Sequence, residues 1–165
     1  MTAITLHSRG PQETQALGRA LGAALVAGQV IALIGPLGAG KTTLVKGLAA
    51  GAGVADPRRV NSPTFVLVNE YEAAEGGQEL RIHHVDAYRL RGGGDLEALG
   101  FDEMLTQGVV VVEWADRVVD LLPPDTLTIR LSPAAEEART LVCAAGGPGS
   151  ARLLAALSRW AEGDE

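Results

Sequence analysis

The stretch GPLGAGKTT, residues 35–43, decides the fold that we expect. Gly35, Gly40, Lys41 and Thr42 fit the phosphate-loop pattern G-x-x-x-x-G-K-[ST], in which successive backbone N–H groups surround phosphate oxygens. Glycine at the first and sixth positions permits backbone geometry that a Cβ would obstruct. The apolar run VIALI precedes the loop and a helical pattern follows it. A buried strand, this loop and a helix are the context in which the motif binds phosphate.

The whole loop is predicted to hold the phosphates of a nucleotide. Lys41 would reach the β- and γ-phosphates, the hydroxyl of Thr42 would ligate Mg²⁺, and the helix N-terminus would add positive potential. The predicted nucleotide-binding residues are Gly35, Pro36, Leu37, Gly38, Ala39, Gly40, Lys41, Thr42 and Thr43. ATP is preferred over GTP, because the chain contains neither an Asn/Thr-Lys-x-Asp stretch nor an Asp-x-x-Gly switch. The expected cofactors are therefore ATP and Mg²⁺.

Two acidic residues at the ends of predicted strands are candidates for holding magnesium and for orienting an attacking water. Glu113 follows the run VVVV and resembles a Walker B acid with Glu in place of the usual Asp, while Asp86 follows RIHHV. We predict Lys41, Asp86 and Glu113 as catalytic residues, and Thr42 and Glu113 as metal ligands. Which of the two acids orients the water stays open at this point.

Three further residues are not assigned to catalysis or to metal binding. His83 and His84 are adjacent on a predicted strand, so their side chains should point to opposite faces, and both are interpreted as structural. Thr14, near the start of the first predicted helix, is a candidate neighbour of the adenine.

The pattern along the chain predicts an α/β fold, namely a three-layer sandwich of the P-loop NTPase type. Its mixed central sheet should contain two antiparallel hairpins, one within 64–90 and the other within 125–145. Helices are expected over 11–25, over 41–53 with Gly51 and Gly53 closing it, after a cap at Asp95, and over 150–161. We predict a single P-loop ATPase domain over residues 1–165, with 160–165 as a solvated tail.

Composition and charge exclude several classes of function. The net charge of −6 argues against a protein that grips nucleic acid through its own basic surface. The single cysteine, Cys143, allows neither an intrachain disulfide nor a cysteine-based zinc site. The first ten residues do not resemble a secretory signal, and no apolar run approaches membrane-spanning length. We therefore expect a cytoplasmic protein that does not associate with membranes.

The order and spacing of five segments resemble the TsaE family, formerly YjeE, over roughly residues 5–131. These segments are GPLGAGKTT, NSPTFVLVNEY, HHVDAYRL, GFDEML and VVVVEW. The family consists of bacterial P-loop ATPases that are needed for the threonylcarbamoyl modification of adenosine 37 in tRNA. The resemblance implies an ATPase that hydrolyses ATP to ADP and phosphate, weakly without its partners. Those partners would be the TsaB–TsaD complex, and tRNA would be met only indirectly.

The resemblance also implies roles for individual residues. Glu113 matches the family's magnesium-linked acid, and Asp86 matches the acid that is needed for hydrolysis. The residues similar to a switch region or to partner contacts are Ser62, Pro63, Thr64, Tyr88, Arg89 and Trp114. The alternative is a small-molecule P-loop kinase, for which YRLRGGGD at 88–95 is the only candidate lid.

Overall fold

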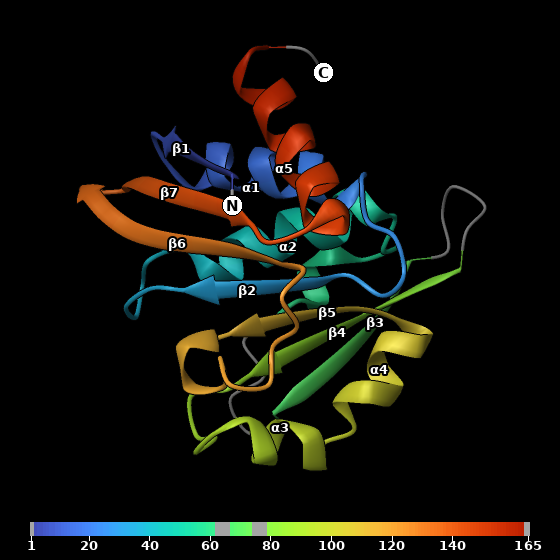
Figure 1. Cartoon of the computed structure of the whole chain (residues 1–165). Helices are drawn as coiled ribbons and strands as arrows, with labels where there is room; N and C mark the ends of the chain where they lie inside the picture. The colour runs from blue at the N-terminus through green and yellow to red at the C-terminus, as the bar shows by residue number, and fades with distance from the viewer. Residues whose placement is uncertain (1, 62–66, 74–78, 164–165) are drawn as a thin grey trace.

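A seven-stranded mixed sheet lies between two layers of helices in the computed structural model, which describes residues 2–61, 67–73 and 79–163 (Figure 1). The strands are β1 (Thr2–Ser8), β2 (Val30–Ile34), β3 (Val68–Ala73), β4 (Leu80–Asp86), β5 (Gly108–Glu113), β6 (Thr126–Ala135) and β7 (Ala138–Ala145). The α-helices are α1 (Pro11–Gly22), α2 (Lys41–Ala52), α3 (Gly93–Ala98), α4 (Phe101–Gln107) and α5 (Pro148–Ala161). Two short 3₁₀-helices are η1 (Pro57–Arg59) and η2 (Ala115–Arg117).

The sheet has the strand order β1-β7-β6-β2-β5-β4-β3. Its centre is parallel, because β2 pairs in parallel with both β5 and β6, and β4 pairs in parallel with β5. Its two edges are antiparallel: β3 pairs with β4 on one side, and β6, β7 and β1 form the other. The α/β class, the mixed sheet and the two antiparallel hairpins are thereby confirmed. The carboxyl ends of β2, β4 and β5 meet at one edge, where a P-loop fold binds its ligand.

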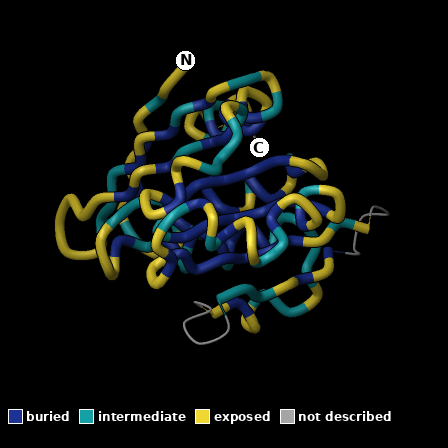
Figure 2. The backbone as a smooth tube through the Cα atoms, turned by 60° about the horizontal axis from the view of Figure 1, so that its bottom comes forward, coloured by how far each residue is buried: buried dark blue, intermediate teal, exposed yellow. Residues whose placement is uncertain are grey.

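Strands β2 and β5 are buried along almost their whole length, as expected for strands with both faces covered, and they are apolar except for Glu113 at the end of β5 (Figure 2). On one face, Ile31 and Leu33 of β2 pack with leucines of α1, α2 and α5. On the other, Val30 and Ala32 pack with residues of α3, α4 and η2. Alternate side chains of β2 therefore pack into two separate hydrophobic cores, one on each face of the sheet. Burial on both faces fixes the position of the strand that leads into the phosphate loop.

Helices α1 and α2 approach each other so closely that each needs glycine at the contact. A Cβ on Gly18 or Gly22 would meet backbone atoms of Leu44 or Leu48, and a Cβ on Gly47 would meet the backbone of Gln15. Gly51 likewise faces the backbone of Arg19. The prediction that Gly51 closes α2 is therefore wrong, because it lies inside the helix as a contact residue. Gly53 ends the helix in a left-handed conformation, as predicted.

Three further boundaries differ from the sequence-based expectation. Helix α1 ends at Gly22, and Gly28 lies beyond it in the turn before β2. Asp95 does not cap a helix: it lies in the first turn of α3, where its carboxylate accepts the Arg91 N–H at 2.9 Å. Trp160 is partly buried against the core and α5 continues to Ala161, so residue 160 belongs to the folded body and not to a solvated tail.

Within the described ranges, none of the helices combines the length and the apolar character needed to cross a bilayer.

Candidate active site

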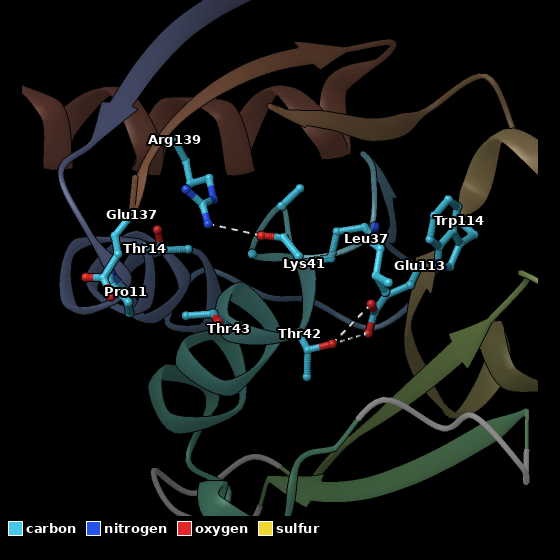
Figure 3. A pocket seen from close by; sticks show the side chains of 13 residues that line it. Pro11, Thr14, Leu37, Lys41, Thr42, Thr43, Glu113, Trp114, Glu137 and Arg139 are labelled. Carbon is cyan, nitrogen blue, oxygen red and sulfur yellow. Dashed lines mark hydrogen bonds between the residues drawn. The ribbon is translucent and has the colours of Figure 1, made fainter. Parts of the chain in front are cut away.

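A cavity of ≈ 250 Å³ opens around the phosphate loop (Figure 3). It is lined by Pro11, Thr14, Leu37, Gly38, Ala39, Gly40, Lys41, Thr42, Thr43, Glu113, Trp114, Glu137 and Arg139. The structure therefore brings together most of the predicted loop with Glu113 and Trp114. Thr14 also lines the cavity, at the start of α1, where its hydroxyl lies 2.7 Å from the hydroxyl of Ser8.

The backbone of the loop explains its glycines. Gly38 and Gly40 have φ values of 78° and 102°, a left-handed region that residues with a Cβ rarely adopt. Gly35 serves a different purpose, because a Cβ there would meet the carbonyl of Leu131 on β6. The first turn of α2 follows directly, so its free N–H groups and its positive end face the cavity. This geometry fits the phosphate groups of a nucleotide.

Lys41 is 5% exposed and points back over the loop. Its Nζ donates to the carbonyls of Gly35 and Pro36, and it lies 4.0 Å from the centroid of the Trp114 ring. Burial lowers the pKa of Lys41, an effect that the carboxylates of Glu113, Asp116 and Asp86 oppose. The contacts of the ammonium are thus two neutral backbone carbonyls and an aromatic ring. The negatively charged phosphates of a nucleotide would bind it more strongly.

Glu113 ends β5 directly opposite the first turn of α2. Its side chain is 3% exposed, and both carboxylate oxygens accept from the Thr42 hydroxyl at 3.2 Å (Figure 3). A hydroxyl and a carboxylate beside a phosphate loop are oxygen ligands of the kind that Mg²⁺ prefers. Oε2 of Glu113 also lies 2.5 Å from Nε2 of His84. The interpretation of His84 as structural missed this contact, although its companion prediction of opposite faces for His83 and His84 agrees with their different partners.

Asp86 ends β4 and is paired in register with Glu113 on the neighbouring strand. It is 6% exposed, and its carboxylate accepts the Tyr88 N–H at 2.9 Å. Asp86 is not among the residues that line the cavity in the described part of the chain. The two predicted acids therefore come from adjacent strand ends, with Glu113 facing Thr42 and Asp86 facing the turn that follows β4.

Trp114 turns back over Lys41 because its backbone is left-handed, with φ 58°. A non-glycine residue in this region is uncommon and persists where its surroundings hold it. The Tyr88 ring contacts Trp114 edge to face at 4.9 Å between centroids, and the Arg117 guanidinium lies 5.2 Å from the Tyr88 ring. Tyr88 is 51% exposed and Arg89 is exposed beside it. A stack thus runs from the loop lysine to the surface.

Three lining residues were not predicted from the sequence, namely Pro11, Glu137 and Arg139. Arg139 donates to the Gly38 carbonyl at 3.0 Å, so it supports the tip of the loop from β7. Its sequence neighbourhood, EEART, reads as an ordinary hairpin turn. Glu137 and Arg139 come to the loop because β7 pairs with β6, which lies beside β2, whereas Pro11 is the first residue of α1. The predicted switch residues Ser62, Pro63 and Thr64 lie outside the described residues.

The comparison with protein families agrees with this geometry. The family described as "Threonylcarbamoyl adenosine biosynthesis protein TsaE" matches residues 8–141. The chain belongs to the TsaE family. The match extends from β1 into β7, so it includes the loop, both acids and Arg139.

Relatives in the TsaE family match over most of the chain. The TsaE protein of Bacillus subtilis, named a tRNA threonylcarbamoyladenosine biosynthesis protein, is 39% identical over 160 residues, which cover 96% of each chain. The TsaE protein of Streptomyces coelicolor is 46% identical over 119 residues, 72% of this chain and 78% of its own. The crystal structure of YdiB from Bacillus subtilis superposes with a TM-score of 0.79 at 34% identity and covers 96% of both chains. The P-loop NTPase fold is consistent with this neighbour.

Proposed function

We propose that this protein is a magnesium-dependent ATPase that serves the threonylcarbamoyl modification of adenosine 37 in tRNA. It would act with the TsaB–TsaD complex, meet tRNA only indirectly, and hydrolyse ATP weakly when alone. The pathway rests on the family match over residues 8–141 and on the names of the relatives. A cytoplasmic location stays a prediction.

The single observation that carries the ATPase is the position of Glu113 opposite Thr42 at the phosphate loop. Hydrolysis needs phosphates held by backbone N–H groups, a metal between phosphates and protein oxygens, and an acid to manage the attacking water. The loop supplies the N–H groups and Lys41, while the 3.2 Å contacts join the hydroxyl of Thr42 to the carboxylate of Glu113. Magnesium would replace the hydrogen bond between them and supply positive charge that stabilises the transferring phosphoryl group.

Asp86 supports the same proposal from the next strand end. Its pairing with Glu113 places two carboxyl groups at the edge of the sheet, one facing the loop and one facing the β4–α3 turn. Glu113 is therefore the metal-linked acid in this proposal. Asp86 is the acid that would orient water once a nucleotide fills the site.

The proposal is tested by measuring ATP hydrolysis by the purified protein with and without the TsaB–TsaD complex. We expect slow turnover alone and a clear stimulation by the complex, together with threonylcarbamoyl-tRNA formation that requires this protein. A rate that the complex leaves unchanged would contradict the partner assignment. ADP that forms only when a small molecule becomes phosphorylated would favour the kinase alternative, to which the names of the matched relatives give no support.

Replacing Glu113 by glutamine is expected to lower the rate of hydrolysis by about 10²-fold, because one charge aimed at the metal is lost. The folded state should persist, since glutamine has the same shape and retains a carbonyl that accepts hydrogen bonds. Steady-state hydrolysis and thermal unfolding of Glu113→Gln check both points. The matched control is Glu103→Gln, an exposed glutamate on α4, which should hydrolyse ATP at the wild-type rate. Asp86→Asn, measured in parallel, shows whether the second acid is needed as well.

The roles of Tyr88, Arg89 and Trp114 in partner contact stay predictions. The stack of Trp114 on Lys41 and of Tyr88 on Trp114 supports them, because a partner that touches the exposed Tyr88 ring would reach the loop lysine through two aromatic contacts.

A further inference from the structure

A chain of buried side chains crosses three strands behind the candidate metal site. Tyr71 on β3, His84 on β4 and Glu113 on β5 follow one another on the same face of the sheet. The Tyr71 hydroxyl lies 3.1 Å from Nδ1 of His84, and Nε2 of His84 lies 2.5 Å from Oε2 of Glu113. All three are buried, with His84 0% exposed. The series ends at Thr42, whose hydroxyl donates to Glu113 at 3.2 Å.

The hydrogen-bonding capacities of these groups fix the direction of each bond. An ionised carboxylate only accepts, so Nε2 of His84 must carry the proton that it donates to Glu113. In the neutral ring, Nδ1 then accepts the Tyr71 hydroxyl proton. Tyr71 thus donates its hydroxyl proton to His84 and forms the outer end of the series. Burial raises the pKa of Tyr71, which keeps the phenol protonated.

The contact with His84 fixes the orientation of the Glu113 carboxylate, which would otherwise be free to rotate. A glutamate side chain has three rotatable bonds, and a carboxylate at the end of a strand can turn either oxygen toward the loop. The contact with His84 engages Oε2, and His84 is not among the described residues that line the cavity. The Thr42 hydroxyl donates to both oxygens at 3.2 Å, and Oε1 is the one that His84 does not contact. Oε1 is therefore the oxygen left for whatever the loop binds. The backbone register sets this arrangement, because His84 pairs with Val111, two residues before Glu113.

Resting on the proposed function, we propose that His84, supported by Tyr71, is a positioning residue that orients the Glu113 carboxylate toward the magnesium of the bound nucleotide. His84 is not among the lining residues in the described part of the chain, so it would act through Glu113. Groups that hold a metal-linked ligand in place typically change metal affinity or activity by about 10–100-fold when they are replaced. The structural alternative is that His84 only satisfies buried polar atoms, in which case its loss would affect stability alone.

Two substitutions separate the two contacts of the His84 ring. The Nε2 of glutamine can occupy the place of the ring Nε2, so His84→Gln retains a donor for Glu113. Asparagine is shorter and places its amide near Nδ1, so His84→Asn retains only the contact with Tyr71. The adjacent His83 offers a matched control, because it is 1% exposed on the same strand and, among the described residues, neither ring nitrogen makes a hydrogen bond. Its Nδ1 lies 3.5 Å from Oε1 of Glu70, which does not line the cavity.

The experiment measures ADP affinity with EDTA, the Mg²⁺ concentration that half-saturates the ADP-bound protein, and kcat and KM for ATP. For His84→Asn we expect the half-saturating Mg²⁺ concentration to rise about 10-fold and kcat to fall 10–100-fold, with metal-free ADP affinity unchanged. His84→Gln should restore both values to within about threefold of wild type, and His83→Gln should change neither. Tyr71→Phe, which removes only the distal hydroxyl, should give a smaller rise and serves if His84→Asn does not fold.

Two results would overturn the positioning role. One is a folded His84→Asn, or Tyr71→Phe in its place, with wild-type magnesium dependence. The other is a loss of ADP affinity that is equal with and without metal, which indicates a general disturbance of the loop. The binding measurements do not depend on turnover. If the wild-type protein bound Mg-ADP but did not hydrolyse ATP, the proposed function would fail while the magnesium titrations still decided the role of His84.

Discussion

Lys41→Met is expected to abolish most ATP hydrolysis while leaving the protein folded. The ammonium of Lys41 is the positive side chain that the loop aims at the phosphates, and removing one such preorganised charge lowers a rate by about 10²–10³-fold. Methionine has a similar length, and its thioether packs favourably against an aromatic ring, here that of Trp114. Because burial lowers the pKa of Lys41, its charge is disfavoured in the folded state, and the melting temperature should stay the same or rise.

The chain provides a matched control, since it contains only one other lysine, Lys46. Lys46 is partly exposed on α2, one turn beyond the loop, and it does not line the cavity. Lys46→Met should retain hydrolysis and nucleotide binding near wild-type values. The rate of ATP hydrolysis and the nucleotide affinity, measured on both variants, test whether Lys41 contacts the phosphates. Equal activity in the two variants would mean that Lys41 does not contact phosphate.

Gly47→Ala is expected to destabilise the fold by about 2 kcal/mol or more, although alanine is the better helix former. The gain in helix propensity is at most about 1 kcal/mol. This gain is outweighed by overpacking, which typically destabilises a protein by about 1–3 kcal/mol. The cost is larger where the backbone itself must move. The new Cβ would meet the carbonyl, carbonyl carbon and Cα of Gln15, so no side chain can rotate out of the way. Helix α1 would have to move away from α2.

Gly94→Ala in α3 is the control for this substitution. It also places alanine in a helix, but nothing lies within 4 Å of the new Cβ, so stability should remain the same or increase slightly. Urea unfolding of the two variants measures both effects. A Gly47→Ala protein as stable as Gly94→Ala would show that α1 and α2 can separate at little cost, which contradicts the close contact of Gly47 with the Gln15 backbone.

The fold and the loop could be predicted because their signals are local. VIALI, GPLGAGKTT and the helical pattern after them are contiguous, and each residue type has a reason in its own neighbourhood. The same holds for Glu113, which directly follows an apolar strand. The family resemblance from the motifs is confirmed by the match over residues 8–141. Magnesium, ATP and the site roles derived from them stay predictions.

The features that could not be predicted from the sequence depend on contacts between segments that are distant along the chain. His84 contacts Glu113 only because β4 and β5 pair in one particular register, and a shift by one residue would turn it to the other face. Arg139 reaches Gly38 because β7 lies next to β6. Trp114 covers Lys41 because of one left-handed residue, and the letters "EW" do not reveal that conformation. Gly51 resembled a helix end because its contact with Arg19 lies in another helix.

The pairing of β1 with β7 has a consequence for the order in which the protein is made. Thr2 pairs with Ala145 and Ser8 with Arg139, so the first strand finds its neighbour only after the last strand has been synthesised. The phosphate loop and Glu113 leave the ribosome earlier, but Arg139, which supports the tip of the loop, does not. Contacts between such distant segments form late and slowly. A growing chain therefore carries the phosphate-binding sequence before it has a complete pocket, and the pocket can be completed only after β7 has been synthesised.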